Sequence, residues 1–372
     1  MKIAYIAVKG MPLGGGVEKY TEELGARLAA RGHEIIVYAT RHYRARDGAY
    51  NGMRIRTVPS VNVRAFEKMT AAAMATLINM AERKVDIVHF HAFGPAMFCL
   101  IPRLQGRRVV VQGHGLEWKR SRWGLAGRLF LKLSEMPSVR FPHAVSVVSC
   151  VQQKYLRERY KRESVYIPPG ACVPQPEPPE LIKGSGLCGG GYILFAARLV
   201  REKGAHYLIE AYRKLGAGPK LKLVIAGDAP HEDAYKSRLR GMAGGDPNII
   251  FPGFATGKLL RELFSNAYLF VLPSEVEGLP TALLEAMSYG NCCLASDIPE
   301  NREALAGNGY TFKSRDAADL ARKLSALMDA PELVRRMKER ARLHVAENYS
   351  WDKIADYFEM MYKAVIAGAP GW

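Results

Sequence analysis

Short apolar runs alternate with amphipathic stretches along the whole chain, the pattern of β-strands and α-helices around a mainly parallel sheet. The amphipathic stretches predict helices that include 17–31, 65–83, 151–160, 205–215 and 316–328. The apolar runs of the first half predict strands at Lys2–Val8, Glu34–Ala39, Ile55–Val58, Ile87–His89, Val109–Gln112, Ala144–Val148 and Ser164–Ile167. Those of the second half predict strands at Tyr192–Ala197, Lys222–Ala226, Ile249–Phe251, Tyr268–Leu272 and Cys292–Ala295. The fold class is therefore α/β, in two similar halves.

A stretch rich in proline and glycine, IPPGACVPQPEPPELIKGSGLCGGGY, separates the halves and continues neither periodicity. A chain of 372 residues also has the length of two ordinary domains. We expect a first domain at 1–170, a linker at 171–191, a second domain at 192–350 and a last helix at 351–372. Ligands of open parallel sheets bind beyond the carboxyl ends of the strands, so we expect the site in a cleft between the halves.

Composition excludes several classes of protein. Apolar residues make up 48% and charged residues 24% of the chain, which excludes a disordered or fibrous chain. No apolar run is long enough for a membrane-spanning helix, and the apolar N-terminus is interrupted too soon, at Lys9, for a signal peptide. We therefore expect a cytoplasmic protein.

Charge is distributed unevenly. The formal charge is +17, and residues 1–180 carry 28 basic and 14 acidic side chains, whereas residues 181–372 carry 25 and 22. The basic first half suggests an anionic partner, such as a phosphorylated substrate or an anionic membrane. Nucleic acid is not expected, because the basic residues are not organised around a recognisable recognition module.

The densest basic stretch, around 118–132, mixes cations with aromatic and aliphatic residues. Such a pattern is typical of a helix lying in the plane of a bilayer, and equally of an ordinary amphipathic helix packed on a sheet. Both interpretations stay open. The candidate residues for contact with membrane or acceptor are Trp118, Arg120, Trp123 and Arg128.

Two loops that follow predicted strands have residues suited to a phosphate group. Glycines 14–16 come after the first strand and open a helix, where Gly15 and Gly16 let the backbone approach an anion, although a tight turn fits equally well. Arg198 and Lys203 follow the strand that ends at residue 197. A guanidinium and an ammonium at the carboxyl end of a strand suit a diphosphate.

The strongest motif is PSEVEGLPTALLEAMSYG at 273–290. Pro280 suits a first helical turn and Gly290 a helix end, so we expect the helix to begin inside the motif with free amides at Thr281 and Ala282. Glu277 precedes this helix and Glu285 lies in its second turn. One carboxylate then lies beside the reactive end of a bound anion, and the other is placed for ribose hydroxyls.

A histidine, His114, closely follows the strand at 109–112, and it can donate to a sugar hydroxyl or phosphate and titrate near neutral pH, although a capping histidine fits comparably well. His89 and His91 form a weaker pair at another strand end. We expect no metal cofactor, because the sequence contains neither Asp-x-Asp nor a Cys-x-x-Cys pair.

Together these residues resemble the retaining GT-B glycosyltransferases of family GT4. The resemblance covers essentially the whole chain and rests on the GGG-V-E opening, His114, the R-x4-K of Arg198 and Lys203, and the E-x7-E of Glu277 and Glu285. It implies two Rossmann-like domains with parallel sheets facing across a cleft. The second domain would hold a nucleotide-sugar donor, the first would hold the acceptor, and the last helix would return to the first domain.

The resemblance also implies the roles of particular residues. Arg198 and Lys203 would neutralise the leaving diphosphate, and Glu285 would hold the ribose. Glu277, with the amides of Gly278 and Leu279, would orient the donor sugar, and Phe254 would contact the base. The residues that it implies for catalysis are Glu277, His114, Arg198 and Lys203, with no metal and no other cofactor.

The segment GLEWKRSRWG is similar to a narrower group that includes polysaccharide rhamnosyltransferases, although that group often has aspartate where this chain has His114. The expected activity is metal-independent transfer, with retention, from a nucleotide diphosphate sugar to a hydroxyl of a lipid-linked or cell-surface saccharide. The enzyme would then be cytoplasmic or peripheral on the inner face of the cell membrane. A soluble small-molecule acceptor and a nucleotide-sugar epimerase remain the alternatives.

Overall fold

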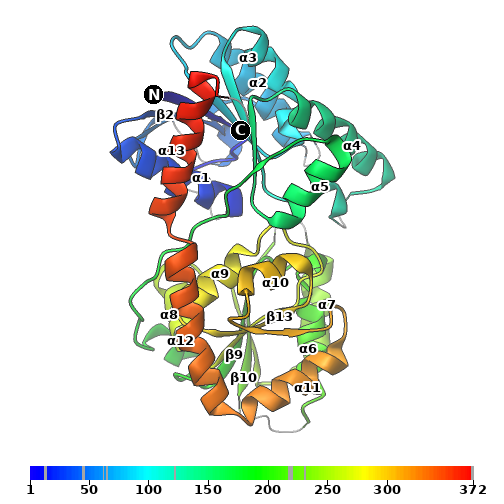
Figure 1. Cartoon of the computed structure of the whole chain (residues 1–372). Helices are drawn as coiled ribbons and strands as arrows, with labels where there is room; N and C mark the ends of the chain where they lie inside the picture. The colour runs from blue at the N-terminus through cyan, green and yellow to red at the C-terminus, as the bar shows by residue number, and fades with distance from the viewer. Residues whose placement is uncertain are drawn as a thin grey trace. The chain divides into compact units, whose positions relative to one another are not determined.

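The computed structural model describes residues 1–11, 15–43, 47–61, 63, 66–120, 123–216, 221–229 and 232–369. The chain divides into two compact units (Figure 1). Unit 1 is Met1–Gly170 together with Trp351–Trp372, and unit 2 is Ala171–Ser350.

Unit 1 is built on an eight-stranded sheet in the order β3-β4-β2-β1-β5-β6-β7-β8. All neighbouring strands are parallel except β3 and β4. The strands are β1 Lys2–Ile6, β2 Glu34–Thr40, β3 Gly48–Tyr50, β4 Met53–Val58, β5 Ile87–His91, β6 Arg108–Gly113, β7 Ala144–Val147 and β8 Val165–Tyr166. The helices of this unit are α1 Gly16–Ala30, α2 Glu67–Met80, α3 Leu100–Leu104, α4 Leu125–Arg140, α5 Cys150–Tyr160 and α13 Trp351–Ala367, with short 3-10 turns at Arg41–Tyr43, Pro95–Cys99 and Glu117–Lys119.

Both faces of this sheet are buried, which explains why its strands are apolar almost throughout. Along β1, Ile3 and Tyr5 pack with α1 and α13, while Ala4 and Ile6 pack with α2, α4 and α5 on the opposite face. The helix α13 is held to α1 by ion pairs as well, from Arg31 among others. The last helix is thus an integral part of unit 1.

Unit 2 has a six-stranded, all-parallel sheet in the order β11-β10-β9-β12-β13-β14. Its strands are β9 Tyr192–Ala196, β10 Lys222–Ala226, β11 Ile249–Gly253, β12 Leu269–Leu272, β13 Cys292–Ser296 and β14 Tyr310–Phe312. Its helices are α6 Ala205–Arg213, α7 Asp233–Ala243, α8 Gly257–Asn266, α9 Thr281–Ser288, α10 Pro299–Leu305, α11 Ala317–Met328 and α12 Pro331–Asn348, with 3-10 turns at Leu181–Ser185 and Arg201–Lys203. One face of the sheet packs against α6, α7, α11 and α12.

The structure corrects several predicted element bounds. The first strand ends at Ile6 rather than at residue 8, because Ala7 has a φ of 74° and cannot continue an extended strand. The three-residue strands β3 and β14 are absent from the prediction, since they are too short for a period of two to show. The helix expected at 65–83 spans Glu67–Met80, and position 65 lies outside the described residues.

The proline-rich stretch that we interpreted as a linker is packed within unit 2. The backbone N–H groups of Glu180 and Ile182 donate to the buried Glu262 carboxylate of α8 at 2.9 and 3.2 Å. Glu177 pairs with Arg261 of the same helix at 2.8 Å. Glu177, Glu180 and Ile182 of this stretch therefore have partners on α8, while most of residues 171–191 are exposed.

Helices in the described part of the chain are either too short or too polar to cross a bilayer.

Candidate active site

The parallel strands of each sheet share a direction, so their carboxyl ends lie along one side of the sheet and their amino ends along the opposite side. We call these two sides the carboxyl edge and the amino edge. In unit 2 the loop with Arg198 and Lys203 leaves β9 at the carboxyl edge. Gly204 ends this loop with a φ of 73°, and a Cβ there would lie 2.0 Å from the carbonyl oxygen of Pro273. Only glycine permits that approach. The R-x4-K loop is thereby packed against the start of the 273–290 motif.

The contact brings Lys203 and Glu277 together. Lys203 Nζ lies 2.5 Å from Glu277 Oε1, and the two side chains are only 15% and 7% exposed. Ser274 Oγ donates to the same Oε1 at 2.6 Å. Both contacts fall on one oxygen, and no described residue is hydrogen-bonded to Oε2. A carboxylate held by one oxygen presents the other as a hydrogen-bond acceptor, which suits a sugar hydroxyl.

The sequence did not predict a series of buried hydrogen bonds that leads from the Glu277 loop to β13 and α10. Ser296 Oγ on β13 donates to the carbonyl oxygen of Ser274 at 2.5 Å, and Asn301 Nδ2 on α10 donates to Ser296 Oγ at 2.8 Å. All three side chains are fully buried. The one available signal was Ser274 itself, a hydroxyl inside the Pro-Ser-Glu run of the motif. Ser296 and Asn301 stand in separate segments, and only the parallel pairing of β12 and β13 brings their elements to this motif.

The structure places Arg198 at the same edge but with a different partner. Its guanidinium lies 4.0 Å from Glu202 Oε1, and the side chain is half-exposed. The neighbouring Glu275 is held by Tyr207 at 3.1 Å and by Arg315 at 2.8 Å. Arg198 is thus available from solvent, whereas the ammonium of Lys203 is engaged by Glu277.

Helix α9 starts at Thr281, with Pro280 as its N-cap and no capping side chain. The Glu277–Gly278–Leu279 segment leads into that end, and Glu285 lies in the second turn, as the sequence predicts. The first-turn amides of Thr281 and Ala282 carry the positive end of the helix dipole. An anion at this end would meet amides and the Lys203 ammonium together.

Phe254 follows β11 at the outer end of the sheet and is 61% exposed. It is an accessible ring, and no ring-stacking contact with another described residue is recorded for it.

In unit 1, His114 leaves the carboxyl end of β6 and joins a stack of histidines from two strands. His91 Nδ1 lies 3.1 Å from His114 Nε2, with ring centroids 5.4 Å apart, and His89 stacks on His91 at 4.4 Å. Tyr362 of α13 contacts His89 Nδ1 at 2.6 Å, and Tyr20 of α1 packs edge-on against His114. The VHFH pair and His114, separate signals in the sequence, are therefore one cluster.

Burial lowers the pKa of His114 to about 3, with the Lys68 ammonium adding to the effect. The pKa values of His89 and His91 are also lowered, mainly by burial. The rings are neutral at physiological pH, so the expectation that His114 titrates near neutrality is wrong. A neutral ring still donates one hydrogen bond and accepts another.

Of the predicted glycines, Gly15 caps α1 and Gly16 is its first residue, while position 14 lies outside the described residues. Glu18 of the same helix turn accepts a hydrogen bond from the backbone N–H of Lys9 at 3.4 Å. The loop thus lies at the carboxyl edge of the unit 1 sheet, after β1.

The four residues that we expected to contact membrane or acceptor differ in how far they are exposed. Trp118 is half-buried, with its indole N–H bonded to Glu135 at 3.2 Å and the Lys132 ammonium 4.5 Å above its ring. Trp123 packs on Gly127, whereas Arg128 is exposed on α4. Arg120 precedes α4 and is partly buried.

No group of three His, Cys, Asp or Glu side chains in the described ranges has the arrangement of a metal site.

Two family models match the chain. "Glycosyltransferase Family 4" matches residues 14–172, and "Glycosyl transferases group 1" matches residues 186–344. Together they cover every strand except β1, and they include the His114 loop, the R-x4-K loop and the E-x7-E motif. The chain is a GT-B glycosyltransferase of family GT4.

Solved structures share the fold of this glycosyltransferase along its whole length. The sucrose-phosphate synthase of Thermosynechococcus elongatus superposes with a TM-score of 0.87 at 20% identity, covering 99% of this chain and 100% of that one. HepE of Anabaena, in complex with UDP-glucose, gives 0.79 at 17% identity, covering 98% and 100%.

The relatives of this chain are named for diverse activities. An uncharacterized glycosyltransferase of Methanocaldococcus jannaschii is 31% identical over 173 residues, 46% of this chain and 44% of that relative, so the alignment spans less than half of its length. The gpi3 subunit of the phosphatidylinositol N-acetylglucosaminyltransferase of Schizosaccharomyces pombe is 26% identical, covering 95% and 78%. The N-acetyl-alpha-D-glucosaminyl L-malate synthase of Bacillus anthracis is 25% identical, covering 97% of both.

Proposed function

We propose that this glycosyltransferase moves a sugar from a nucleotide diphosphate sugar to a hydroxyl of a lipid-linked or cell-surface saccharide, with retention at the anomeric carbon and without a metal ion. The observation that carries the proposal is the Lys203–Glu277 pair beside the uncapped start of α9. It combines a cation and amides for a diphosphate with a carboxylate for a sugar. The complex of HepE with UDP-glucose supports a donor of this class.

In the proposed reaction the bond between the anomeric carbon and the diphosphate oxygen breaks. A new bond joins that carbon to the acceptor oxygen, and the acceptor proton passes to the departing diphosphate on the same face of the sugar. Lys203, Arg198 and the α9 amides would stabilise the growing negative charge. Glu277 Oε2 would hold a donor hydroxyl, Glu285 the ribose and Phe254 the base. His114 would donate to the sugar as a neutral ring.

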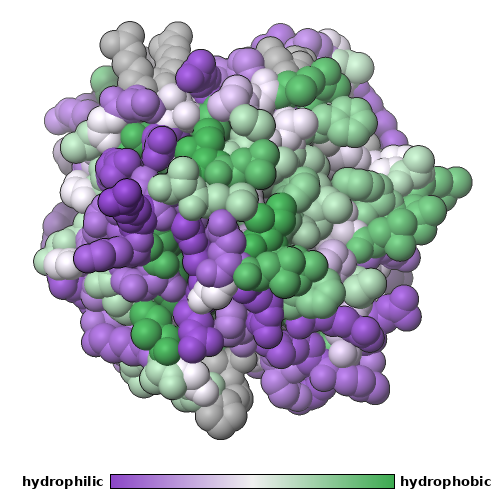
Figure 2. Space-filling view, turned by 90° about the horizontal axis from the view of Figure 1, so that it is seen from above, coloured by the Kyte–Doolittle hydropathy of each residue, from purple (hydrophilic) through white to green (hydrophobic). Residues whose placement is uncertain are grey.

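A membrane-bound acceptor is favoured by the surface of α4. Leu125 is 86% exposed, and the helix exposes four further large apolar side chains, at Leu129, Phe130, Leu133 and Met136. Figure 2 shows hydrophobic side chains projecting on the right, the side where α4 lies in Figure 1.

The charges of α4 favour the same partner. The exposed charged side chains of the helix, at Arg128, Lys132 and Arg140, are all basic. Its one acidic side chain, Glu135, is buried and accepts hydrogen bonds from Tyr155 and Tyr160. Exposed leucines flanked by cations suit an anionic bilayer, and we propose that α4 lies on one peripherally.

The reaction is tested with a panel of nucleotide diphosphate sugars offered together with native lipid extract, following release of nucleotide diphosphate. We expect release with one donor that requires the extract, persists in EDTA and gives a product of retained anomeric configuration by NMR. Interconversion of the free donor without acceptor would instead identify an epimerase. Release that needs only a soluble acid such as malate would favour a small-molecule acceptor, the class named for the Bacillus anthracis relative.

The membrane contact is tested by sedimentation with phosphatidylglycerol vesicles. The Leu129→Asp/Leu133→Asp variant should lose binding, while the control Leu343→Asp, an equally exposed leucine of α12, should retain it. Equal binding by both variants would exclude α4 as the contact.

A further inference from the structure

A hollow of about 240 Å³ lies in unit 1 at the amino edge of the sheet, away from the carboxyl edge that carries His114. A water molecule occupies about 30 Å³ in the liquid, so the hollow has room for a multi-atom ligand. Its walls come from the start of β6, the segments before β7 and β8, and the ends of α3, α4 and α13. The lining residues are Arg103, Arg108, Arg140, Pro142, His143, Arg162, Val365, Gly368 and Ala369.

Four of the residues that line this hollow are arginines. Among the described residues, no carboxylate lies within 4.0 Å of any of them. The guanidinium Nε of Arg162 is buried and has no hydrogen-bond partner. A buried donor without a partner is costly in a folded protein, and an anionic ligand would pair with it and neutralise the four arginines, of which Arg103 and Arg140 are exposed.

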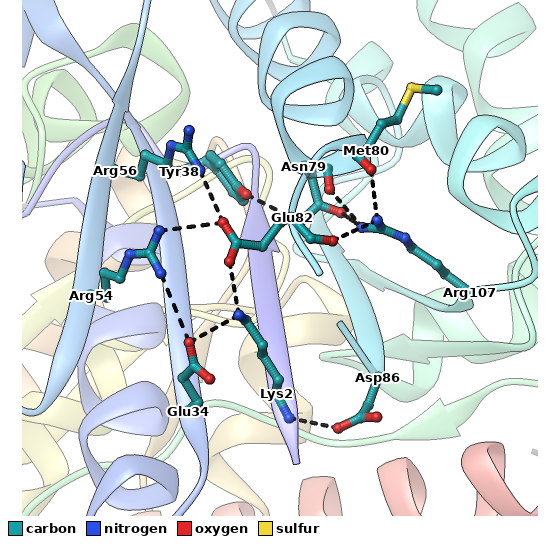
Figure 3. A network of polar contacts seen from close by, with 10 residues as sticks. All are labelled: Lys2, Glu34, Tyr38, Arg54, Arg56, Asn79, Met80, Glu82, Asp86 and Arg107. Carbon is teal, nitrogen blue, oxygen red and sulfur yellow. Dashed lines mark hydrogen bonds and ion pairs between the residues drawn. The ribbon is translucent and has the colours of Figure 1, made fainter. Parts of the chain in front are cut away.

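At the other half of the amino edge, basic side chains are paired with carboxylates. There Glu82 accepts contacts from Lys2 at 2.8 Å, Arg56 at 2.9 Å and Arg54 at 3.3 Å (Figure 3). Glu34 adds a second carboxylate to the cluster. Basic side chains at the amino ends of β1, β2 and β4 are therefore paired with carboxylates. Those at the amino ends of β6, β7 and β8 that line the hollow have no such partner among the described residues.

The hollow is held in shape by backbone contacts. Arg103 donates to the carbonyl oxygen of Phe141 at 2.6 Å, and Arg162 donates to those of Pro142 and His143 at 3.1 and 3.0 Å. These two arginines are fixed, whereas the guanidinium groups of Arg108 and Arg140 donate no hydrogen bond to another described residue.

His143 adds a further donor. Its Nδ1 accepts the backbone N–H of Val109 at 3.0 Å, so the neutral ring carries its proton on Nε2. Burial, together with the positive charges of Arg103, Arg108 and Arg162, lowers the pKa of His143 to about 4. The site thus presents N–H donors and no acidic side chain.

We infer that this hollow is a second anion-binding site, which takes a phosphate or diphosphate group between the guanidinium groups of Arg108 and Arg140, on the floor made by Arg103 and Arg162. Guanidinium groups bind phosphate oxygens through paired, charge-assisted hydrogen bonds. The same chemistry is offered by a soluble phosphate ester and by a lipid headgroup. The inference does not depend on the proposed sugar transfer.

The test measures binding of inorganic pyrophosphate to the full chain by calorimetry at low salt. Because the diphosphate site proposed at Lys203 would bind the same probe, every protein carries Arg198→Ala and Lys203→Ala. On this background Arg108→Gln/Arg140→Gln should weaken binding about tenfold or more, since each substitution removes charge-assisted hydrogen bonds to the anion. The control Arg83→Gln, an exposed arginine at the same edge, should leave the affinity unchanged. Affinity should also fall with ionic strength.

The source of the anion is separated by two further probes, glycerol phosphate in solution and vesicles containing phosphatidic acid. Loss of glycerol phosphate binding in the double variant identifies a soluble ligand. The vesicle comparison also carries Leu129→Asp/Leu133→Asp, so that contact through α4 is removed, and loss of vesicle binding alone then identifies a headgroup. Arg103 and Arg162 are left intact because their loss would disturb the loops that they bind. The inference is overturned if Arg108→Gln/Arg140→Gln binds all three probes as well as Arg83→Gln does.

Discussion

Two clusters of this glycosyltransferase combine a lysine with a shielded glutamate, and they lie at opposite edges of their sheets. Glu277 in unit 2 is bound by Lys203 and Ser274 at the carboxyl edge. Glu82 in unit 1 is bound by three cations at the amino edge and is 11% exposed, about as shielded as Glu277. Residue types and burial do not distinguish them. Strand direction does, because ligands of open parallel sheets bind beyond the carboxyl ends.

The number of contacts separates them as well. Glu82 uses both carboxylate oxygens on protein cations, Oε1 on Lys2 and Oε2 on Arg54 and Arg56. Glu277 uses only Oε1. A saturated carboxylate stabilises the fold, and a half-used one can bind a substrate. Substitutions in the two clusters should therefore affect different measurements.

The largest effect is expected for Lys203→Ala. Loss of a cation that stabilises a leaving diphosphate typically lowers turnover about 10²–10³-fold. Steady-state release of nucleotide diphosphate measures this. Lys214→Ala, which removes an exposed ion pair with Glu210, is the control and should keep the wild-type rate. A fully active Lys203→Ala enzyme would place the site elsewhere.

Glu82→Gln should act on stability instead. The substitution removes the carboxylate that three cations share and leaves Lys2 and Arg54 with Glu34 alone. We expect the free energy of unfolding to fall by about 1–3 kcal/mol in urea titrations. kcat/KM should stay within about twofold at a temperature where the variant is folded. Glu332→Gln, which breaks an exposed pair with Arg335, should change neither quantity. A selective loss of kcat in Glu82→Gln would contradict the division between the two edges.

Ser274→Ala should have a smaller effect on catalysis. It removes one hydrogen bond to Glu277, with a contribution of about 1 kcal/mol, so kcat/KM should fall by roughly fivefold. The control Ser134→Ala also removes one hydrogen bond from a buried serine, here from Oγ to the backbone carbonyl oxygen of Phe130 on α4. If the two variants show the same kcat/KM, Ser274 does not position Glu277.

The smallest effect concerns acid stability. The hydrogen bond from Lys2 lowers the pKa of Glu82 in the folded state. The stability that Glu82 contributes is therefore complete above the unfolded pKa of about 4.3 and is lost as the pH falls through the lowered folded value. The unfolding free energy of Glu82→Gln should accordingly vary less with pH below about 4.3 than that of the wild type. If the unfolding free energies of the two proteins changed in parallel with pH, the contacts of Glu82 would not lower its pKa in the folded state.

Much of the fold was predictable because buried parallel strands are apolar runs of recognisable length. The Glu277 loop and the Thr281 start of α9 were also predictable, since proline and glycine mark the ends of the motif. The partners of these residues were not. Gly204 approaches Pro273 through tertiary packing, and the histidines at 89, 91 and 114 meet because β5 and β6 are adjacent. Such pairings depend on strand order, which periodicity does not contain.

The arrangement of α13 has a consequence for how the enzyme is made. This helix covers Tyr5 and Tyr20 on one face of the unit 1 sheet and supplies Tyr362 to His89. During translation the ribosome finishes all of unit 2 before it synthesises α13. The part of unit 1 that precedes unit 2 is therefore synthesised with this apolar face uncovered, and α13 can cover it only after unit 2 has been made.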